Sequence, residues 1–349
     1  MTIYKDVIEL DGSIGGGQVL RTALSLAMIT GKALHIHHIR AKRSRPGLMR
    51  QHLTAVMAAA QVCGAQVEGA ELNSQELRFS PGSIKGGDYR FAIGTAGSCT
   101  LVLQTLLPAL LHASENSTVT ISGGTHNPLA PPFDFLHLAW LPLLQRMGAD
   151  VELQLLRHGF VPAGGGELRA VVKPSTLRPL HLPERGALLR QEARALIAGI
   201  PGSVGERELL RVSKRLDIPT SGRNIVWLDP EQGPGNALLL QYDCEALTEV
   251  FCAFGQTGVR AEAVADRAVE PAREWLASSA AVAEHLADQL MLPMALAGGG
   301  SFSTVRMTEH MQSNMAVIEH FLPVRFESQA QGHSVLVSCM NLQRQQHRG

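Results

Sequence analysis

The chain has 349 residues, of which 45% are hydrophobic and 18% charged, and its formal net charge at pH 7 is zero. This length exceeds what one hydrophobic core usually serves, and the composition is that of a folded globular protein rather than a disordered one. A protein that coats nucleic acid without specificity is normally basic. Any contact with nucleic acid should therefore be a local basic site.

The cysteines and the apolar segments indicate a location for the chain. None of the five cysteines forms a CxxC pair, which argues against a disulfide framework and a zinc–thiolate site. Residues 1–6 already include Lys5 and Asp6 and have no long apolar core, unlike a secretory signal. The most apolar stretch, residues 101–113, is too short and too interrupted to cross a bilayer. We therefore expect no membrane association and a cytoplasmic location.

Two segments share a pattern that indicates a repeated unit. Residues 48–63 have apolar side chains at helical spacing and are followed by Gly64-Ala-Gln-Val-Glu68. Residues 133–147 show the same spacing and are followed by Gly148-Ala-Asp-Val-Glu152. Strand-like alternation and a cluster of proline and glycine come next in both cases. The sequence predicts a duplicated α/β unit.

A third, weaker copy is predicted at the C-terminus. It would contain helices over residues 288–297 and 313–321, followed by a hairpin over residues 324–339 that turns near Gln331. Ser313 or Asn314 is the expected N-cap of the second helix.

The amino-acid composition of the sequence changes between the second and third units. Residues 206–216 are rich in glutamate and arginine at helical spacing, and turn residues follow over 229–236. This indicates a smaller α/β domain over residues 184–275, inserted between the first two units (residues 1–183) and the third (residues 276–349).

Two segments are candidate anion sites. Residues 12–18 place three consecutive glycines before a helix, where backbone N–H groups attract anions, but they lack the Gly-Lys-Ser/Thr of a P-loop. A tight turn is the simpler interpretation. Residues 40–52 concentrate arginine and lysine between a strand (residues 33–39) and a helix. That placement favours a phosphate site and a solvated loop about equally.

Two further residues attract attention. His310 lies in a polar stretch before an apolar helix, where a place near the start of the helix is the plain interpretation. Asp288 precedes Gln289 inside the apolar run of residues 286–296. A buried acid needs a partner or a catalytic task.

Several strings, in order along nearly the whole chain, resemble the RNA 3'-terminal phosphate cyclase family. They are Gly15-Gly-Gly-Gln-Val-Leu-Arg21, Arg45-Pro-Gly-Leu-Met-Arg-Gln-His52, Gly86-Gly-Asp-Tyr-Arg-Phe-Ala-Ile-Gly94, Ala96-Gly-Ser-Cys-Thr-Leu-Val-Leu-Gln104, Arg157-His-Gly159 and Leu286-Ala-Asp-Gln289.

The resemblance implies three repeats of two helices on a four-stranded sheet, an α/β (α+β) fold, with a small inserted domain. It also implies an enzyme that uses ATP to convert the 3'-terminal phosphate of RNA to a 2',3'-cyclic phosphate through a covalent histidine–AMP adduct. RNA with a 3'-terminal phosphate is the implied partner. ATP and a divalent cation, Mg²⁺ or Mn²⁺, are the implied cofactors.

The functional positions of the family carry over to single residues of this chain. His310 matches the nucleophile. The ATP-binding positions match Gln104, Pro131, His285, Leu286, Ala287, Asp288 and Gln289. The positions that line the phosphate side match Arg21, Arg40, Arg43, Gln51 and His52. Asp288 is also the candidate metal ligand.

Two positions depart from the pattern of the family. The usual Gly-Glu step before the three glycines is missing, so the loop is two residues shorter and Ile14 stands where the acid is expected. His285 stands where tyrosine is frequent. The missing acid bears on metal and triphosphate binding.

Competing interpretations remain open at this point. The missing acid keeps open a non-catalytic, cyclase-like RNA-binding protein of ribosome assembly. An enolpyruvyl transferase, whose architecture is similar, would need no nucleophilic histidine. The sequence leaves open the physiological RNA, the preferred metal and the oligomeric state, a homodimer included.

Overall fold

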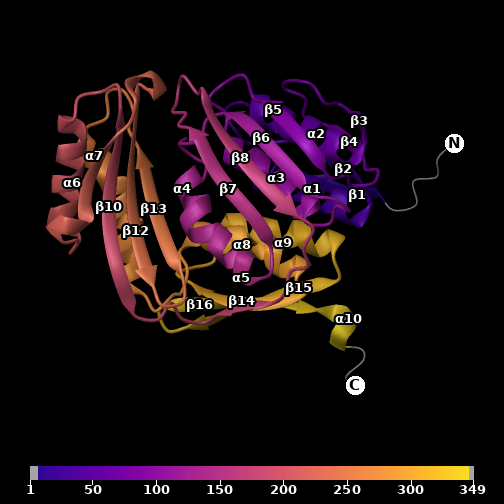
Figure 1. The fold of residues 1–349 in the computed structure, drawn as a ribbon. Coiled ribbons are helices and arrows are strands. Elements are labelled where there is room, and N and C mark those ends of the chain that lie inside the picture. The colour runs from indigo at the N-terminus through magenta and orange to yellow at the C-terminus, as the bar shows by residue number, and fades with distance from the viewer. Residues whose placement is uncertain (1–6, 346–349) are drawn as a thin grey trace.

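The computed structural model describes residues 7–345, so the prediction about a signal in residues 1–6 lies outside the described residues. The described chain has an α+β fold with four separate four-stranded sheets (Figure 1). Three of the sheets belong to repeats that share one topology, as the sequence predicted, and the fourth belongs to a unit inserted into the third repeat.

The first repeat follows the order strand, helix, strand, helix, strand, strand. Its elements are β1 (Val7–Asp11), α1 (Gly17–Thr30), β2 (Ala33–His37), α2 (Arg50–Cys63), β3 (Gln66–Glu68) and β4 (Leu77–Ser80). The sheet order is β1-β2-β4-β3, with β1 and β2 parallel and the other pairs antiparallel. A parallel pair needs a crossover connection, which α1 supplies.

The second repeat has the same order of elements and the sheet order β5-β6-β8-β7. Its elements are β5 (Gly87–Ala92), α3 (Cys99–Leu110), β6 (Ser117–Gly123), α4 (Phe133–Phe135), η1 (Leu136–Trp140), α5 (Leu141–Arg146), β7 (Asp150–Arg157) and β8 (Gly166–Lys173). The helix predicted over residues 133–147 is therefore present, but its middle is a π-helical turn, η1.

The third repeat has the sheet order β15-β16-β14-β9, with β9 parallel to β14. Its elements are β9 (Leu180–Leu182), α8 (Glu284–Leu296), β14 (Gly299–Thr304), α9 (Glu309–Phe321), β15 (Val324–Gln331) and β16 (Ser334–Asn341), followed by α10 (Leu342–Gln345). The inserted unit stands between β9 and α8, where the other repeats have a direct connection.

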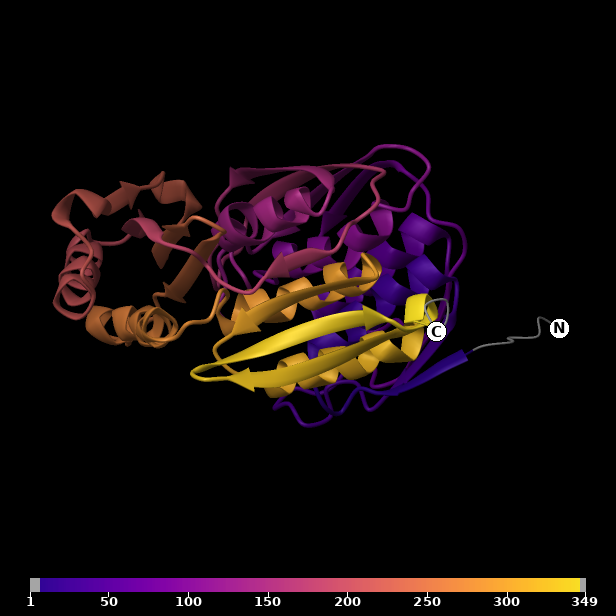
Figure 2. The same cartoon turned by 90° about the horizontal axis from the view of Figure 1, so that it is seen from below.

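The inserted unit lies to one side of the repeats (Figures 1 and 2). Its elements are β10 (Leu188–Ala198), α6 (Ser203–Arg215), η2 (Thr220–Gly222), β11 (Arg223–Trp227), η3 (Pro230–Gln232), β12 (Gly235–Cys244), β13 (Thr248–Phe254) and α7 (Ala261–Ala277). The sheet order is β11-β10-β12-β13. The unit has its own apolar cluster, in which Tyr242 and Trp275 are fully buried.

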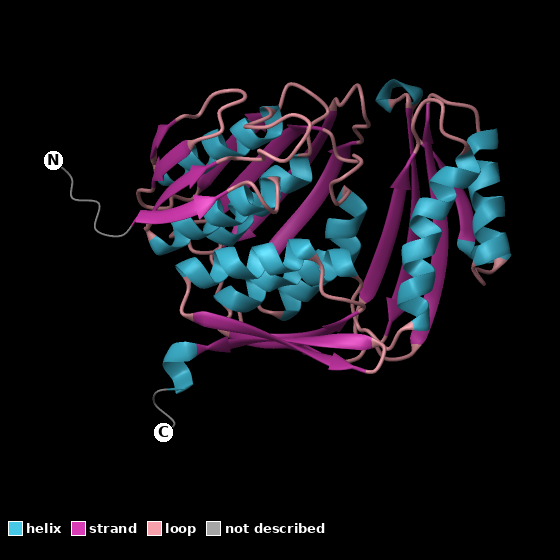
Figure 3. Ribbon diagram, turned by 180° about the vertical axis from the view of Figure 1, so that it is seen from behind, coloured by secondary structure: helices cyan, strands magenta, loops and turns pink. Residues whose placement is uncertain are grey.

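In the repeats, the sheets lie outside and the helices lie between them (Figure 3). Helix α1 contacts both α3 and α9, and α8 packs on α9. Leu20 and Leu24 of α1, Leu103 of α3 and Leu290 of α8 are fully buried in this shared core. Burial of such side chains is worth about 1.5–3 kcal/mol each. The packing of α1, α3, α8 and α9 brings polar side chains from all three repeats close together.

The sequence predicted several local features correctly. Gly64 ends α2 in the left-handed conformation, with φ of 63°, and the C-terminal hairpin turns between Gln331 and Ser334. Helix α8 begins at Glu284, four residues before the predicted start at Asp288.

The predicted N-cap of α9 is wrong. The helix begins at Glu309, and Thr308 is the cap, because its Oγ accepts the backbone N–H of Met311 at 3.2 Å. The apolar periodicity starts only at Met311, since the first turn faces solvent, and this placed the predicted start too late. His310 thus lies in the first turn of a helix.

Helix α3 contains most of the apolar stretch of residues 101–113 and carries Pro108 inside it. Within residues 7–345, none of the helices combines the length and the apolar character that a bilayer span requires.

Candidate active site

A pocket lies where α1, α3, α8 and α9 meet. Six of the polar side chains that line it are Gln18, Arg21, Gln104, Asp288, Gln289 and Asn314. They come from all three repeats, so the pocket exists only because the repeats pack helix against helix.

Asp288 is the centre of a hydrogen-bond network in this pocket. Its Oδ1 accepts from the side-chain amides of Gln18 and Asn314, and its Oδ2 accepts from Nε2 of Gln289 at 2.9 Å. Burial raises the pKa of Asp288 above its usual value, while the bond from Gln18 and the charges of His310 and Arg21 act in the opposite direction. These three amide donors satisfy both oxygens of the half-buried carboxylate.

Gln18 connects Asp288 to His310. Its Nε2 donates to the carboxylate of Asp288, which directs its Oε1 to Nδ1 of His310, 3.0 Å away. An amide oxygen only accepts, so Nδ1 of His310 must carry the proton. The neutral ring then has its free lone pair on Nε2. Because His310 is exposed in the first turn of α9, that nitrogen is accessible to a substrate.

A second amide pair lines the wall made by α3 and α8. Nε2 of Gln104 donates to Oε1 of Gln289 at 2.6 Å, and the indole N–H of Trp140 donates to the backbone carbonyl of Gln289 at 3.1 Å. The side-chain carbonyl of Gln104 is buried and has no partner among the described residues. An unpaired buried acceptor is costly, so this position suits a ligand that donates a hydrogen bond.

The glycine loop before α1 touches three cationic or potentially cationic side chains. Gly16 is the N-cap of α1 at φ of 62°, and a Cβ there would lie 3.1 Å from Nη2 of Arg43. A Cβ at Gly17 would lie 2.5 Å from Nε2 of His52 and 3.0 Å from Nη1 of Arg21. Glycine is favoured at position 16 by its left-handed φ and at position 17 by the close approach of the buried ring of His52. Helix N–H groups beside Arg21, Arg43 and His52 are an arrangement that suits an anion.

Burial sets the protonation states of the side chains beside the glycine loop. It lowers the pKa of Arg21 to about 10, while the charge of Asp288 acts to raise it, so Arg21 remains a cation at neutral pH. Burial, together with the charges of Arg21 and Arg40, lowers the pKa of His52 to about 3. His52 is thus neutral, and because its Nδ1 accepts the N–H of Met49 at 3.1 Å, its Nε2 carries the proton that faces the glycine loop.

Comparison with known proteins decides the family. The sequence profile of the RNA 3'-terminal phosphate cyclase family matches residues 13–328. A protein of Pseudomonas fluorescens named RNA 3'-terminal phosphate cyclase is 70% identical over 336 residues, which cover 96% of this chain and 98% of that protein. The chain belongs to the RNA 3'-terminal phosphate cyclase family. This confirms the resemblance seen in the sequence and the prediction of an enzyme of this class.

More distant proteins agree with that membership or add nothing to it. A protein of Salmonella typhimurium with the same cyclase name is 55% identical over 334 residues, which cover 95% of this chain and 98% of that protein. A solved structure of EPSP synthase from Acinetobacter baumannii matches with a TM-score of 0.29 and 10% identity, over 95% of this chain and 64% of that chain. A similarity that weak supports no argument about fold or function.

Two of the positions carried over from the cyclase family support the site from outside the pocket. Nη1 of Arg40 donates to the carbonyl of Gly47 at 2.7 Å and so closes the basic loop on itself. Oε1 of Gln51 accepts the backbone N–H of Ser98 at 2.9 Å, which ties α2 to the start of α3. Both side chains hold backbone that carries other site residues.

Other residues that match functional positions of the cyclase family lie away from the polar wall formed by Gln104 and Gln289. The carbonyl of Pro131 accepts from Oγ1 of Thr100 at 2.7 Å, and His285 is exposed at the start of α8. Leu286 and Ala287 are fully buried in the core of the repeats. Their packing fixes the helix on which Asp288 and Gln289 point into the pocket.

Sequence reasoning missed Gln18, Thr22, Trp140 and Asn314 as site residues. Oγ1 of Thr22 donates to Oδ1 of Asn314 at 2.8 Å, which turns the amide N–H groups of Asn314 toward Asp288. The sequence predicts Asn314 only as a candidate helix cap. Its place among the apolar positions of α9, which it shares with Met311 and Val317, was the available signal for a buried polar role.

Asp288 has few features of a protein-only metal site. Both carboxylate oxygens are engaged by amide donors, and within residues 7–345 no pair of further acidic, histidine or cysteine ligands joins it. A hard cation such as Mg²⁺ favours several oxygen ligands. A cation in this pocket would take its other oxygens from a bound phosphate compound and from water.

Proposed function

We propose that this chain converts the 3'-terminal phosphate of RNA to a 2',3'-cyclic phosphate with ATP as the energy source, through an AMP adduct on His310. The observation that carries the proposal is the chain of contacts from Asp288 through Gln18 to Nδ1 of His310. It fixes the tautomer in which the lone pair of the neutral imidazole lies on the accessible Nε2, which is what attack on phosphorus requires.

In the first step, Nε2 of His310 attacks the α-phosphorus of ATP. A P–N bond forms, the bond to the β-phosphate breaks, and pyrophosphate leaves. Arg21 and Arg43 beside the glycine loop are placed to balance the charge of the triphosphate and the leaving group. The unpaired carbonyl of Gln104 suits a donor such as the amino group of adenine.

In the second step, the 3'-phosphate of RNA takes AMP from His310 and becomes an anhydride. The neighbouring 2'-hydroxyl then attacks the activated phosphorus, and AMP leaves. This last step is intramolecular, and well-oriented reactions of that kind gain effective molarities on the order of 10⁵ M or more. It therefore asks little of the protein.

A divalent cation, Mg²⁺ or Mn²⁺, would supply further charge balance at the phosphates. Asp288 is the residue on this chain that would contact it, and to do so one of its oxygens would have to exchange an amide partner. Ile14 is exposed and offers no ligand where the family usually has an acid. We therefore expect a higher cation requirement than in family members that retain the acid.

A non-catalytic RNA-binding role is the second candidate. The loss of the acid at Ile14 is the observation in its favour. The retained contacts from Asp288 through Gln18 to His310 favour the enzyme, because a protein that only binds RNA does not need an imidazole with a fixed tautomer and an accessible Nε2.

The test is a reaction of the purified chain with ATP, Mg²⁺ and an oligoribonucleotide that ends in a 3'-phosphate. We expect the terminal phosphate to become resistant to phosphatase and AMP to appear in equal amount. The same oligomer with a 2'-deoxy terminal nucleotide should be adenylylated without cyclisation, since it lacks the attacking hydroxyl. RNA binding with no product, even at equimolar protein and RNA, would contradict the proposal in favour of the binding role.

A further inference from the structure

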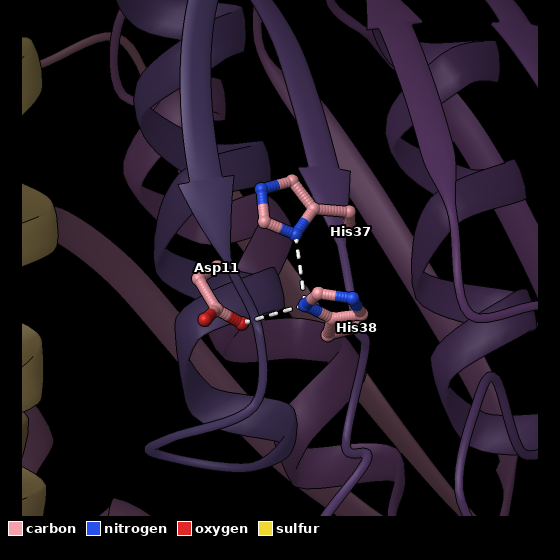
Figure 4. A group of neighbouring side chains, drawn as sticks. All are labelled: Asp11, His37 and His38. Atoms are coloured by element: carbon pink, nitrogen blue, oxygen red, sulfur yellow. Dashed lines mark hydrogen bonds and ion pairs between the residues drawn. The ribbon is translucent and has the colours of Figure 1, made fainter.

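Asp11, His37 and His38 form a compact cluster outside the pocket, at the carboxyl ends of β1 and β2 (Figure 4). One potential ligand atom from each residue lies within 4.8 Å of the other two. Asp11 is the register partner of His37 in the parallel pair, which brings the carboxylate and the first imidazole to the same edge of the sheet.

The backbone at His38 brings the second imidazole into the cluster. Successive residues of a strand point to opposite faces, so His37 and His38 would normally diverge. His38 instead has φ of 53°, and its carbonyl accepts the N–H of Ala41 at 3.0 Å. The chain turns there, and Nδ1 of His37 comes to lie 3.1 Å from Nδ1 of His38, which is 3.5 Å from Oδ1 of Asp11.

His35, two residues earlier on the same strand, shows the contrast. Its ring nitrogens lie 2.6 Å from a carboxylate oxygen of Glu9 and 2.7 Å from one of Glu76, so each faces its own acid. In the cluster, two ring nitrogens face each other and share one carboxylate. A single hydrogen bond satisfies one such nitrogen as donor and the other as acceptor. A cation between them would use both lone pairs.

We propose that Asp11, His37 and His38 bind a divalent first-row transition-metal ion, of which Zn²⁺ is the representative. Two imidazoles and one carboxylate are a ligand set that suits such ions, whereas Mg²⁺ prefers oxygen ligands alone. His38 and Asp11 are exposed and His37 is half-buried, so the ion has access, and water completes its coordination.

The site would also stabilise the start of the glycine loop. Asp11 already accepts the N–H of Ser13 at 2.9 Å, and Gly12 donates its N–H to the carbonyl of His37 at 2.8 Å. A metal ion held by Asp11 and both histidines would fasten β1 to β2 where the shortened loop begins. The inference does not depend on the function proposed above.

The test is titration of the metal-free full chain with Zn²⁺ in the absence of nucleotide, with Co²⁺ absorption as the spectroscopic measurement. We expect one ion per chain, not displaced by millimolar Mg²⁺. Changes in the outer partners of a metal ligand already cost about 10- to 100-fold in affinity, so His37→Gln and His38→Asn should each weaken binding by about 100-fold or more. Asparagine tolerates the left-handed backbone at position 38.

His35→Gln is the matched control, because it removes a neighbouring histidine of the same strand that lies outside the cluster. It should leave Zn²⁺ affinity unchanged. Wild-type protein that binds no more tightly than His37→Gln, or a control variant that loses as much affinity as the cluster variants, would overturn the proposal.

Discussion

In the repeats, Arg21 and Asp288 line one pocket as half-buried side chains, and the buried His52 lies beside Gly17 and Arg21. In the inserted unit, the arginines of α6 pair with the acids of α7 on a surface that solvent reaches. Both oxygens of Asp266 accept from Arg211 at 2.9 Å, and Arg207 makes a similar pair with Glu262. Exposed pairs of this kind contribute little to stability. Burial, in contrast, shifts the pKa values of Arg21, His52 and Asp288.

Among these charges, burial rather than residue type separates the residues proposed for the site from those of the pairs between α6 and α7. Partial removal of Arg21 and Asp288 from water is unfavourable, and charged groups held in this way in a pocket are candidates for a functional role. The pairs between α6 and α7 remain solvated and hold two helices side by side.

The largest expected effect follows from replacing Asp288 of the pocket, compared with Asp266 of the pairs between α6 and α7. Asp288→Asn keeps one acceptor oxygen and replaces the other with an N–H, so the three amide donors of Gln18, Asn314 and Gln289 can no longer all be satisfied, and Gln18 is held less firmly with its oxygen toward His310. By analogy with other histidines held in the wrong tautomer, the rate of protein adenylylation should fall on the order of 10³-fold. The measurement is single-turnover transfer of AMP from ATP to the protein.

Asp266→Asn is the matched control for this experiment. It removes a carboxylate that pairs with Arg211 between α6 and α7, and it should leave the rate of protein adenylylation unchanged. Equal rates for Asp288→Asn and wild type, in variants with the same circular dichroism, would contradict the role given to the network.

The second prediction concerns a buried acid inside the inserted unit. Glu208 is fully buried, its Oε2 accepts from Nδ2 of Asn236 at 3.0 Å, and burial raises its pKa from 4.5 to about 7. The neutral form is favoured in the folded chain, so this stability is present below pH 4.5 and is lost as the pH rises through about 7. Glu208→Gln should be about 3 kcal/mol more stable than wild type at pH 8 and equal to it near pH 4.

Urea unfolding at the two pH values checks this prediction. His52 gives the opposite pH dependence. Because its pKa is lowered in the folded chain, its contribution to the free energy of unfolding is lost as the pH falls below 6.5. A stability difference between Glu208→Gln and wild type that did not change with pH would show that the carboxyl group is not protonated on folding.

The third prediction concerns the junction between the two regions. The guanidinium of Arg185 donates to the carbonyls of Trp275, Leu276, Ser278 and Ala280, and lies 4.4 Å from the ring of Trp275. It thus ties the entry of the insertion to its exit. Arg185→Met should cost about 2 kcal/mol, since it leaves these carbonyls without their charged donor.

Arg211→Met removes an arginine that pairs with Asp266 between α6 and α7, and it should have a much smaller effect on the thermal midpoint than Arg185→Met. Equal shifts of the thermal midpoint in the two variants would show that Arg185 contributes no more to stability than these solvated pairs. The predicted extent of the inserted domain, residues 184–275, ends two residues before α7 does. We therefore propose residues 184–277 as its extent, with Arg185 joining its two ends.

The sequence predicted the repeats well because their signals are local. Apolar spacing and a glycine at the end of each helix determine α2 and the segment that ends at Gly148, and both glycines have positive φ. The π-turn at Leu136–Trp140 escaped prediction, since one extra residue in a turn leaves the apolar pattern nearly unchanged.

The site could be predicted only in part, because its contacts join distant segments. Resemblance to the family indicated His310 and Asp288, but nothing local indicates that Gln18 lies between them. Gln18 is separated from Asp288 by 270 positions and from His310 by 292. The cluster of Asp11 and His38 likewise depends on a left-handed turn that a histidine seldom adopts.

The most direct test of the account is the attachment of label from α-labelled ATP to the protein, compared between His310→Asn and His320→Asn. Both histidines are exposed on α9, but within residues 7–345 the hydrogen bond of His320 is to the carbonyl of Ala316, one turn back on its own helix. We predict that wild type and His320→Asn form an acid-labile AMP adduct and that His310→Asn forms none. Labelling of His310→Asn at the wild-type level would contradict the central claim.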